Sequence, residues 1–175
     1  LVTEVEGSAA FSWSPNGETI VITSGLQGQS RFYRGLKEVS AEGRGDRSIT
    51  DDLILSFYWS PKGDKIAYVT LSEDAEGSTR WGVVDVESGD TCYLGDFRPT
   101  QEQLTAFMFF DQYAQSHNPW SPDGSSIIFA GELGYEKERT VLPTDADARV
   151  LVADVEGQQP PATVGKGIMG FWSPG

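Results

Sequence analysis

A tryptophan-serine-proline turn recurs four times along this chain of 175 residues. It reads WSPNG at 13–17, WSPKG at 59–63, WSPDG at 120–124 and WSPG at 172–175. Proline fixes φ at the first central position of a type I turn, and glycine suits the position that closes it. The tryptophan before each turn offers a large apolar face that can pack between neighbouring sheets. The residues expected to have this structural role are Trp13, Pro15, Gly17, Trp59, Pro61, Gly63, Trp120, Pro122, Gly124, Trp172 and Pro174.

The spacing of the turns predicts the architecture. The repeat tryptophans are 46, 61 and 52 residues apart, and periods above about 40 residues are typical of β-propeller blades with four short strands each. Each complete turn precedes an apolar run rich in β-formers: TIVITS, KIAYVT and SIIFAG. The stretches 81–95 and 148–165 each read as strand, glycine-containing turn and strand. We therefore predict an all-β chain of four-stranded antiparallel blades, with about three blades present in residues 1–175 as a single partial β-propeller domain.

The repeat also resembles that of a known family. A hydrophobic residue, then Trp-Ser-Pro-Asp-Gly-x-x-Ile-x-Phe, then a strand with Asp before a glycine turn, is similar to the β-propeller repeat of TolB. That repeat also occurs in the propellers of tricorn protease and prolyl oligopeptidase-type peptidases. The stretch 124–131, GSSIIFAG, fits best, whereas 26–52 in the first repeat lacks the Val-Asp-Val-Glu strand.

The resemblance implies a non-catalytic module that presents loops and a channel mouth to a protein or peptide partner. It also implies a periplasmic or other extracytoplasmic location. The alternative is an accessory or gating propeller of a larger serine peptidase, whose catalytic domain would lie outside these residues. Propellers close with about four to eight blades, so the chain is expected to belong to a larger propeller. Its two open faces are otherwise expected to be covered by a second copy, as a homodimer.

Charge and motifs exclude several other classes. The chain has 13 Lys and Arg against 26 Asp and Glu, a net charge of −13, which disfavours nucleic acid as a partner. Apolar runs long enough to insert into a membrane are absent, and Cys92 is the single cysteine. The chain has neither a Gly-x-Ser-x-Gly nucleophile motif nor a phosphate-binding loop, and its acidic stretches lack calcium-ligand spacing. We therefore expect it not to be an enzyme, with no catalytic residue, metal or cofactor.

The longest interval, 61 residues, marks the candidate binding segment. We interpret its polar residues as a cluster facing the central channel, on the inner strand or at the channel mouth: Asp111, Gln112, Tyr113, Gln115 and His117. His117, the only histidine, stands three residues before a repeat tryptophan and matches Met169 in register. The alternative is a structural histidine bonded to a neighbouring loop. Upstream, Thr100 and Gln103 have capping-box spacing for a short helix with Leu104, Phe107 and Met108 on one face; a long inner strand fits equally well.

Overall fold

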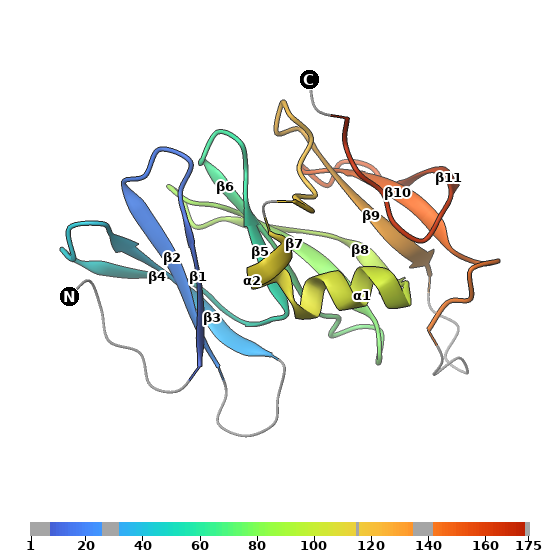
Figure 1. Ribbon diagram of the computed structural model, residues 1–175, viewed down its shortest axis with the longest axis horizontal. Helices are drawn as coiled ribbons and strands as arrows, with labels where there is room; N and C mark the ends of the chain where they lie inside the picture. The colour runs from blue at the N-terminus through green and yellow to red at the C-terminus, as the bar shows by residue number, and fades with distance from the viewer. Residues whose placement is uncertain (1–7, 26–31, 115, 135–141, 174–175) are drawn as a thin grey trace.

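The computed structural model describes residues 8–25, 32–114, 116–134 and 142–173, which form two antiparallel sheets and two short helices (Figure 1). The first sheet has the order β1-β2-β3-β4, and the second has the order β11-β10-β9-β8-β7-β6-β5. The strands of the first sheet are β1 (Ala9–Trp13), β2 (Thr19–Gly25), β3 (Tyr33–Ser40) and β4 (Asp46–Ile54). Those of the second are β5 (Ser56–Trp59), β6 (Lys65–Leu71), β7 (Thr79–Asp85), β8 (Thr91–Pro99), β9 (Ser126–Leu133), β10 (Arg149–Asp154) and β11 (Ala162–Lys166). The all-β antiparallel prediction is confirmed.

Two four-stranded blades follow the expected pattern. Strands β1–β4 form blade 1 and β5–β8 form blade 2, and in each the Trp-Ser-Pro turn joins the first strand to the second. Blade 1 has its outer strands even though 26–52 lacks the Val-Asp-Val-Glu pattern. The pairing of β3 with β4 is irregular around Gly35. Gly35 has φ of 66°, and a methyl group there would lie 2.7 Å from the carbonyl oxygen of Thr50, so this bulge requires glycine.

Blade 3 consists of β9, β10 and β11, and its innermost position differs from the other two. Strand β8 pairs with β7 along most of its length, and its last residues, 97–99, pair with residues 131–133 of β9. Immediately before the third turn, only an isolated bridge joins Trp120 to Ile127. Helices α1 (Gln101–Met108) and α2 (Phe110–Tyr113) lie between β8 and that bridge. Blades 2 and 3 therefore share one continuous sheet.

Helix α1 begins as its capping residue predicts. The Thr100 hydroxyl accepts a hydrogen bond from the Gln103 backbone N–H at 3.1 Å, which satisfies one of the free donors of the first turn. In a capping box the Gln103 side chain would return to the cap. Here its Oε1 instead accepts from the Ala130 N–H of β9 at 3.0 Å. Of the two structures left open by the sequence, the helix is the one that forms.

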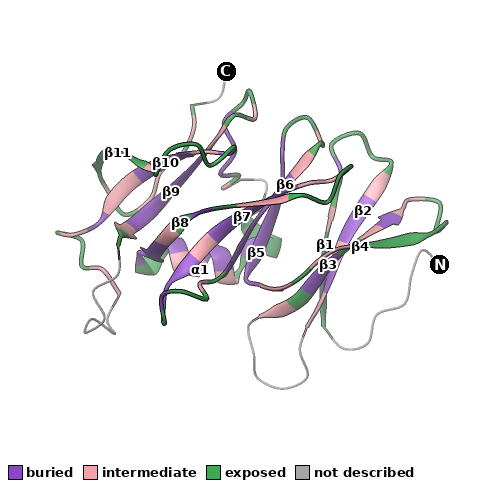
Figure 2. Cartoon of the chain, turned by 180° about the vertical axis from the view of Figure 1, so that it is seen from behind, coloured by how far each residue is buried: buried purple, intermediate pink, exposed green. Residues whose placement is uncertain are grey.

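Helix α1, its cap and the loop after α2 together cover the β9 edge that a first strand would have paired. Besides the Gln103 contact, the Thr100 N–H donates to the Ala130 carbonyl at 3.3 Å, and the Ile128 N–H donates to the Pro119 carbonyl at 2.9 Å. Figure 1 shows α1 across one face of the second sheet, and Figure 2 shows it on the far side from behind. Buried backbone groups need partners, so these contacts allow the helices to replace the strand.

Aromatic side chains fill the core between blades 2 and 3 and the helices. Trp81 stacks on Phe97 with ring centroids 6.4 Å apart and meets Phe107 of α1 edge-on at 5.4 Å. Phe110 of α2 packs 5.0 Å from Phe57 of β5. The same core includes Ala10 and Val21 of blade 1, among other residues, and Figure 2 shows the buried residues running through both sheets. No helix within the described ranges is long and apolar enough to span a bilayer.

Candidate functional site

The repeat tryptophans contact the preceding repeat through one recurring hydrogen bond. The indole Nε1 of Trp59 donates to the Ser12 carbonyl at 3.3 Å, that of Trp120 to the Tyr58 carbonyl at 3.0 Å, and that of Trp172 to the Pro119 carbonyl at 2.8 Å. In every case the acceptor is the residue just before the preceding repeat tryptophan. We call this contact the indole latch. It sets the register between successive repeats at their inner ends.

The turns themselves also stack. A methyl group on Gly63 would lie 3.2 Å from Cδ of Pro15, and one on Gly124 would lie 3.7 Å from Cδ of Pro61. The glycine of each of these turns therefore lies against the proline of the turn before it. Pro174, in the fourth turn, lies outside the described residues.

Serine and acidic side chains close the turns. In the third turn, the Ser126 N–H donates to the Ser121 hydroxyl at 2.9 Å, and the Ser121 hydroxyl lies 2.6 Å from Asp123 Oδ1. These contacts lower the pKa of Asp123 to about 2, with the Ser121 hydroxyl the largest cause and the Ser125 N–H the next. Hydrogen bonds to a carboxylate favour its charged form.

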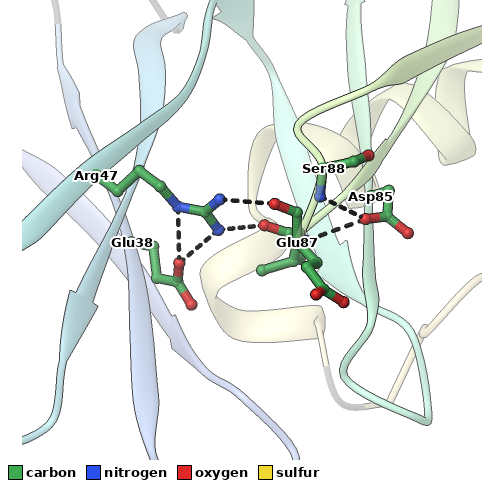
Figure 3. A network of polar contacts seen from close by, with 6 residues as sticks. Glu38, Arg47, Asp85, Glu87 and Ser88 are labelled. Atoms are coloured by element: carbon green, nitrogen blue, oxygen red, sulfur yellow. Dashed lines mark hydrogen bonds and ion pairs between the residues drawn. The ribbon is translucent and has the colours of Figure 1, made fainter.

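An arginine joins blade 1 to blade 2 away from the Trp-Ser-Pro turns (Figure 3). Arg47 of β4 bonds the Glu38 carboxylate at 2.8 Å and also donates to the carbonyls of Val86 and Glu87 in blade 2. The turn that carries these carbonyls is held by Asp85, which accepts from the N–H groups of Glu87 and Ser88. The Ser88 N–H is the largest cause of the lowered pKa of Asp85.

The predicted binding cluster lies on α2 and the turn after it. The ring centroids of Tyr113 and His117 are 5.0 Å apart, and the His117 N–H donates to the Tyr113 carbonyl at 2.8 Å. Asp111 instead contributes to the raised pKa of Tyr33 in blade 1, after the larger effect of burial. Gln112 is exposed, and Gln115 lies outside the described residues. The structure thus brings together Tyr113 and His117 but not Asp111 or Gln112.

Tyr113 and His117 line a groove with a volume of about 290 Å³. Helix α1 forms the opposite wall and the segment before the fourth turn closes one side; the full lining is Gln101, Glu102, Thr105, Ala106, Tyr113, His117 and Met169. Sequence reasoning missed Met169 and the α1 residues as site residues. The repeat register was the available signal for Met169, because it occupies the position of His117 in the next repeat.

The closing segment is held in place from both ends. The Thr100 hydroxyl donates to the Ile168 carbonyl at 2.7 Å, and the Trp172 latch fixes the other end. Between them Gly170 crosses blade 3 so closely that a methyl group there would lie 2.6 Å from Val150. Phe171, which is 54% exposed, packs edge-on against His117 at 5.0 Å. The groove is thus built on ordered contacts.

Polar groups are few in the groove. His117 Nδ1 lies 2.7 Å from the Ser116 hydroxyl, which also donates to the Tyr113 carbonyl at 3.3 Å. Of the described residues, Glu102 is the only carboxylate in the lining, and no lysine or arginine lines it. Among the residues that the structure describes, no group of three His, Cys, Asp or Glu side chains could hold a metal ion. The arrangement suits binding of a partly apolar side chain.

A second hollow lies at the outer edge between blades 2 and 3, beside Cys92. Its lysine, Lys65, lies 3.8 Å from Asp85 and 3.5 Å from Glu156. Burial, followed by the charges of Glu156 and Asp154, raises the pKa of the Cys92 thiol. A thiol with a raised pKa is a poor nucleophile at neutral pH, so the surroundings of Cys92 do not activate its thiol.

Comparison with solved structures identifies the fold. An oligogalacturonate lyase in complex with manganese matches with a TM-score of 0.57 and 13% identity, over 91% of this chain and 36% of that one. The tricorn protease matches with a TM-score of 0.52 and 17% identity, over 86% of this chain and 14% of that one. TolB from Acinetobacter baumannii matches with a TM-score of 0.44 and 18% identity, over 89% and 29%.

No protein-family model matches this chain, and no curated protein matches it by sequence. The chain spans 36% or less of each of the three solved structures. At such low identities the likeness concerns the fold alone. The matches to the lyase and the tricorn protease identify that fold as part of a β-propeller.

Proposed function

We propose that this chain is part of a non-catalytic β-propeller module that binds a protein or peptide partner in the groove between α1 and Met169. The observation that carries the proposal is the local departure from the repeat. Where the other blades have a first strand, this one has two helices, and they create a hollow with aromatic walls. Functional sites of repeat proteins commonly lie where one repeat departs from the rest.

The composition of the groove supports a protein ligand. Tyr113 is 38% exposed, and the neighbouring Ile168 and Phe171 extend the apolar surface beyond the groove. Aromatic residues and methionine are enriched in protein interfaces. A volume of about 290 Å³ lies at the small end for ligand sites and suits one side chain of a peptide whose backbone runs along the rim.

The experiment is a selection of random displayed peptides on the chain, followed by calorimetric titration of the enriched peptides. We expect Tyr113→Ala and Met169→Ala to weaken binding by at least about tenfold, which corresponds to about 1.4 kcal/mol. Leu71→Ala is the control, because Leu71 is exposed to the same extent as Tyr113 but lies on β6 outside the groove lining. If no peptide is enriched, or if the three variants bind equally well, the proposal is wrong.

Self-association is a separate proposal about the faces of the outermost blades. Phe11 and Trp13 are exposed on β1, and Val164 is exposed on β11. Exposed apolar patches of more than a few hundred Å² mark interaction surfaces, so we propose that a second copy or further blades of a longer chain cover these faces. Sedimentation at several concentrations tests whether a second copy covers the faces. An ideal monomer at every concentration would contradict self-association.

Two other proposals rest on the resemblance of the repeat to TolB and to peptidase propellers. One is an extracytoplasmic location. The other is the alternative role as an accessory or gating propeller of a larger serine peptidase. The described residues carry no feature that favours this role over a binding module.

A further inference from the structure

We infer that the groove between α1 and Met169 selects a peptide by a basic side chain, lysine or arginine. The inference rests on the proposed peptide-binding function and adds the class of side chain that enters. Three properties of the groove lead to it: an apolar wall for the stem of the side chain, a carboxylate for its charged head, and a lining without lysine or arginine among the described residues.

The apolar wall suits a long methylene stem. Ala106 is buried, and it lines the groove together with Met169 and the Tyr113 ring. Lysine and arginine place their stems along such surfaces while their charged ends reach polar groups. The half-exposed Tyr113 ring also attracts a cation above its face, which is worth about 0.5–1 kcal/mol at an exposed site. An uncharged apolar side chain would gain only the first of these contacts.

Glu102 supplies a charge for the head group. It lies in the first turn of α1 and lines the groove. The ion pairs among the described residues are formed by Lys37, Arg44, Arg47, Lys65, Arg80 and Arg98, and none of them involves Glu102. The Glu102 carboxylate is therefore available to a basic ligand and would repel an acidic one.

His117 supplies a second polar side chain to the lining. The Ser116 hydroxyl has one proton, and when it donates that proton to the Tyr113 carbonyl its oxygen accepts from His117 Nδ1–H. In that tautomer the lone pair is on Nε2, whereas a Ser116 hydroxyl that donates to Nδ1 leaves the ring proton on Nε2. The edge-on contacts with Tyr113 and Phe171 hold the ring in place. In the first of these tautomers, Nε2 can accept from a guanidinium or ammonium group.

The charge of the whole chain acts in the same direction. A net charge of −13 attracts a basic peptide from a distance, and this attraction weakens as salt is added. Long-range attraction alone would favour any basic peptide at any surface. The groove adds a local requirement, because Glu102 and the Tyr113 ring lie on the same hollow.

The test titrates the isotope-labelled chain with short Gly/Ser peptides that carry one central Phe-Lys pair. Binding is measured by the NMR shifts of the backbone amides of the chain. Otherwise identical peptides carry arginine, norleucine or glutamate in place of lysine. We expect the lysine and arginine peptides to bind at least about tenfold more tightly than the norleucine peptide, with shifts in α1 and near Met169. E102Q should abolish this preference. E76Q should retain it, because Glu76 is also exposed and its loss changes the net charge equally, but it lies outside the groove lining.

The outcomes separate the two proposals. Equal binding of the lysine and norleucine peptides in the groove overturns the basic selection and leaves the peptide-binding function standing. An equal loss of preference in E102Q and E76Q also overturns it, because only the net charge would then matter. If none of the peptides shifts the groove residues, both proposals fail.

Discussion

Replacing a repeat tryptophan by phenylalanine should destabilise the chain strongly at one position and hardly at all at an equivalent one. Trp120 is 3% exposed and its indole Nε1 donates to the Tyr58 carbonyl at 3.0 Å. Phenylalanine lacks the indole N–H, so the Tyr58 carbonyl loses this donor. Phenylalanine also fills less volume than tryptophan. Loss of a buried hydrogen bond costs about 1–3 kcal/mol, and the cavity adds to it, so we expect Trp120→Phe to lower the free energy of unfolding by about 2–4 kcal/mol.

Trp13 occupies the same place in the first repeat but is 51% exposed. No preceding blade lies among the described residues to accept from its indole. We therefore expect Trp13→Phe to change stability by less than about 0.5 kcal/mol. Urea unfolding followed by far-ultraviolet circular dichroism measures both, because tryptophan fluorescence would change with the substitutions themselves. Equal losses in Trp13→Phe and Trp120→Phe would refute the reasoning, since both residues precede a Ser-Pro turn but differ in the latch and in burial.

Three further predictions concern the turns and the edge of β9. Gly63→Ala should destabilise more than Gly17→Ala in thermal unfolding. Both have φ near 72°, but only Gly63 lies against the proline of the preceding turn; equal losses would mean that this contact is unimportant. Gln103→Leu should lower the free energy of unfolding in urea by about 1–3 kcal/mol, because it leaves the buried Ala130 N–H of β9 without its acceptor. Gln101→Leu, at an exposed position of α1, should change it little. The reverse order would contradict the edge-covering role. Asp123 has a folded pKa of about 2 against 3.8, so its stabilising contribution is present above pH 3.8 and lost as pH falls toward 2. In Asp123→Asn the urea midpoint of unfolding should therefore decrease less between pH 3.8 and 2 than it does in the original chain. An equal decrease in both would contradict this contribution of Asp123.

The fold could be predicted because its main signal is local and repeated. A type I turn with Trp, Pro and Gly in fixed order specifies one corner of each blade, and the apolar runs after it specify the second strands. The pairing of 97–99 with 131–133 could not be read from the sequence, because it joins segments more than 30 residues apart. The acceptors of the indole latch are backbone carbonyls, which leave no pattern in the sequence. The choice between helix and inner strand also depended on a distant contact, Gln103 to Ala130.

The sequence indicated only part of the candidate site, because the sharing of a face depends on whether the segment is a strand or a helix. In a strand, alternate residues share a face, so Asp111, Tyr113, Gln115 and His117 would have pointed together. In a helical segment, residues four apart share a face instead. Here α2 ends at Tyr113, and the His117 N–H donates to the Tyr113 carbonyl four residues earlier, so these two rings meet. Asp111 instead contributes to the raised pKa of Tyr33 in blade 1, after the larger effect of burial.

The continuous sheet from β5 to β11 has a consequence for how the molecule opens. Opening blade 3 alone would break the ladder between β8 and β9 as well as the helix contacts, so blades 2 and 3 should unfold as one cooperative unit. Within the described ranges, blade 1 shares no strand pairing with that sheet. It is attached through contacts such as those of the Trp59 indole and Arg47. Native-state hydrogen exchange should then show that the amides of β2 and β3 exchange through an opening of lower free energy than the amides of β6 and β9. Slow motion in this protein would therefore be a hinge between blade 1 and the fused pair.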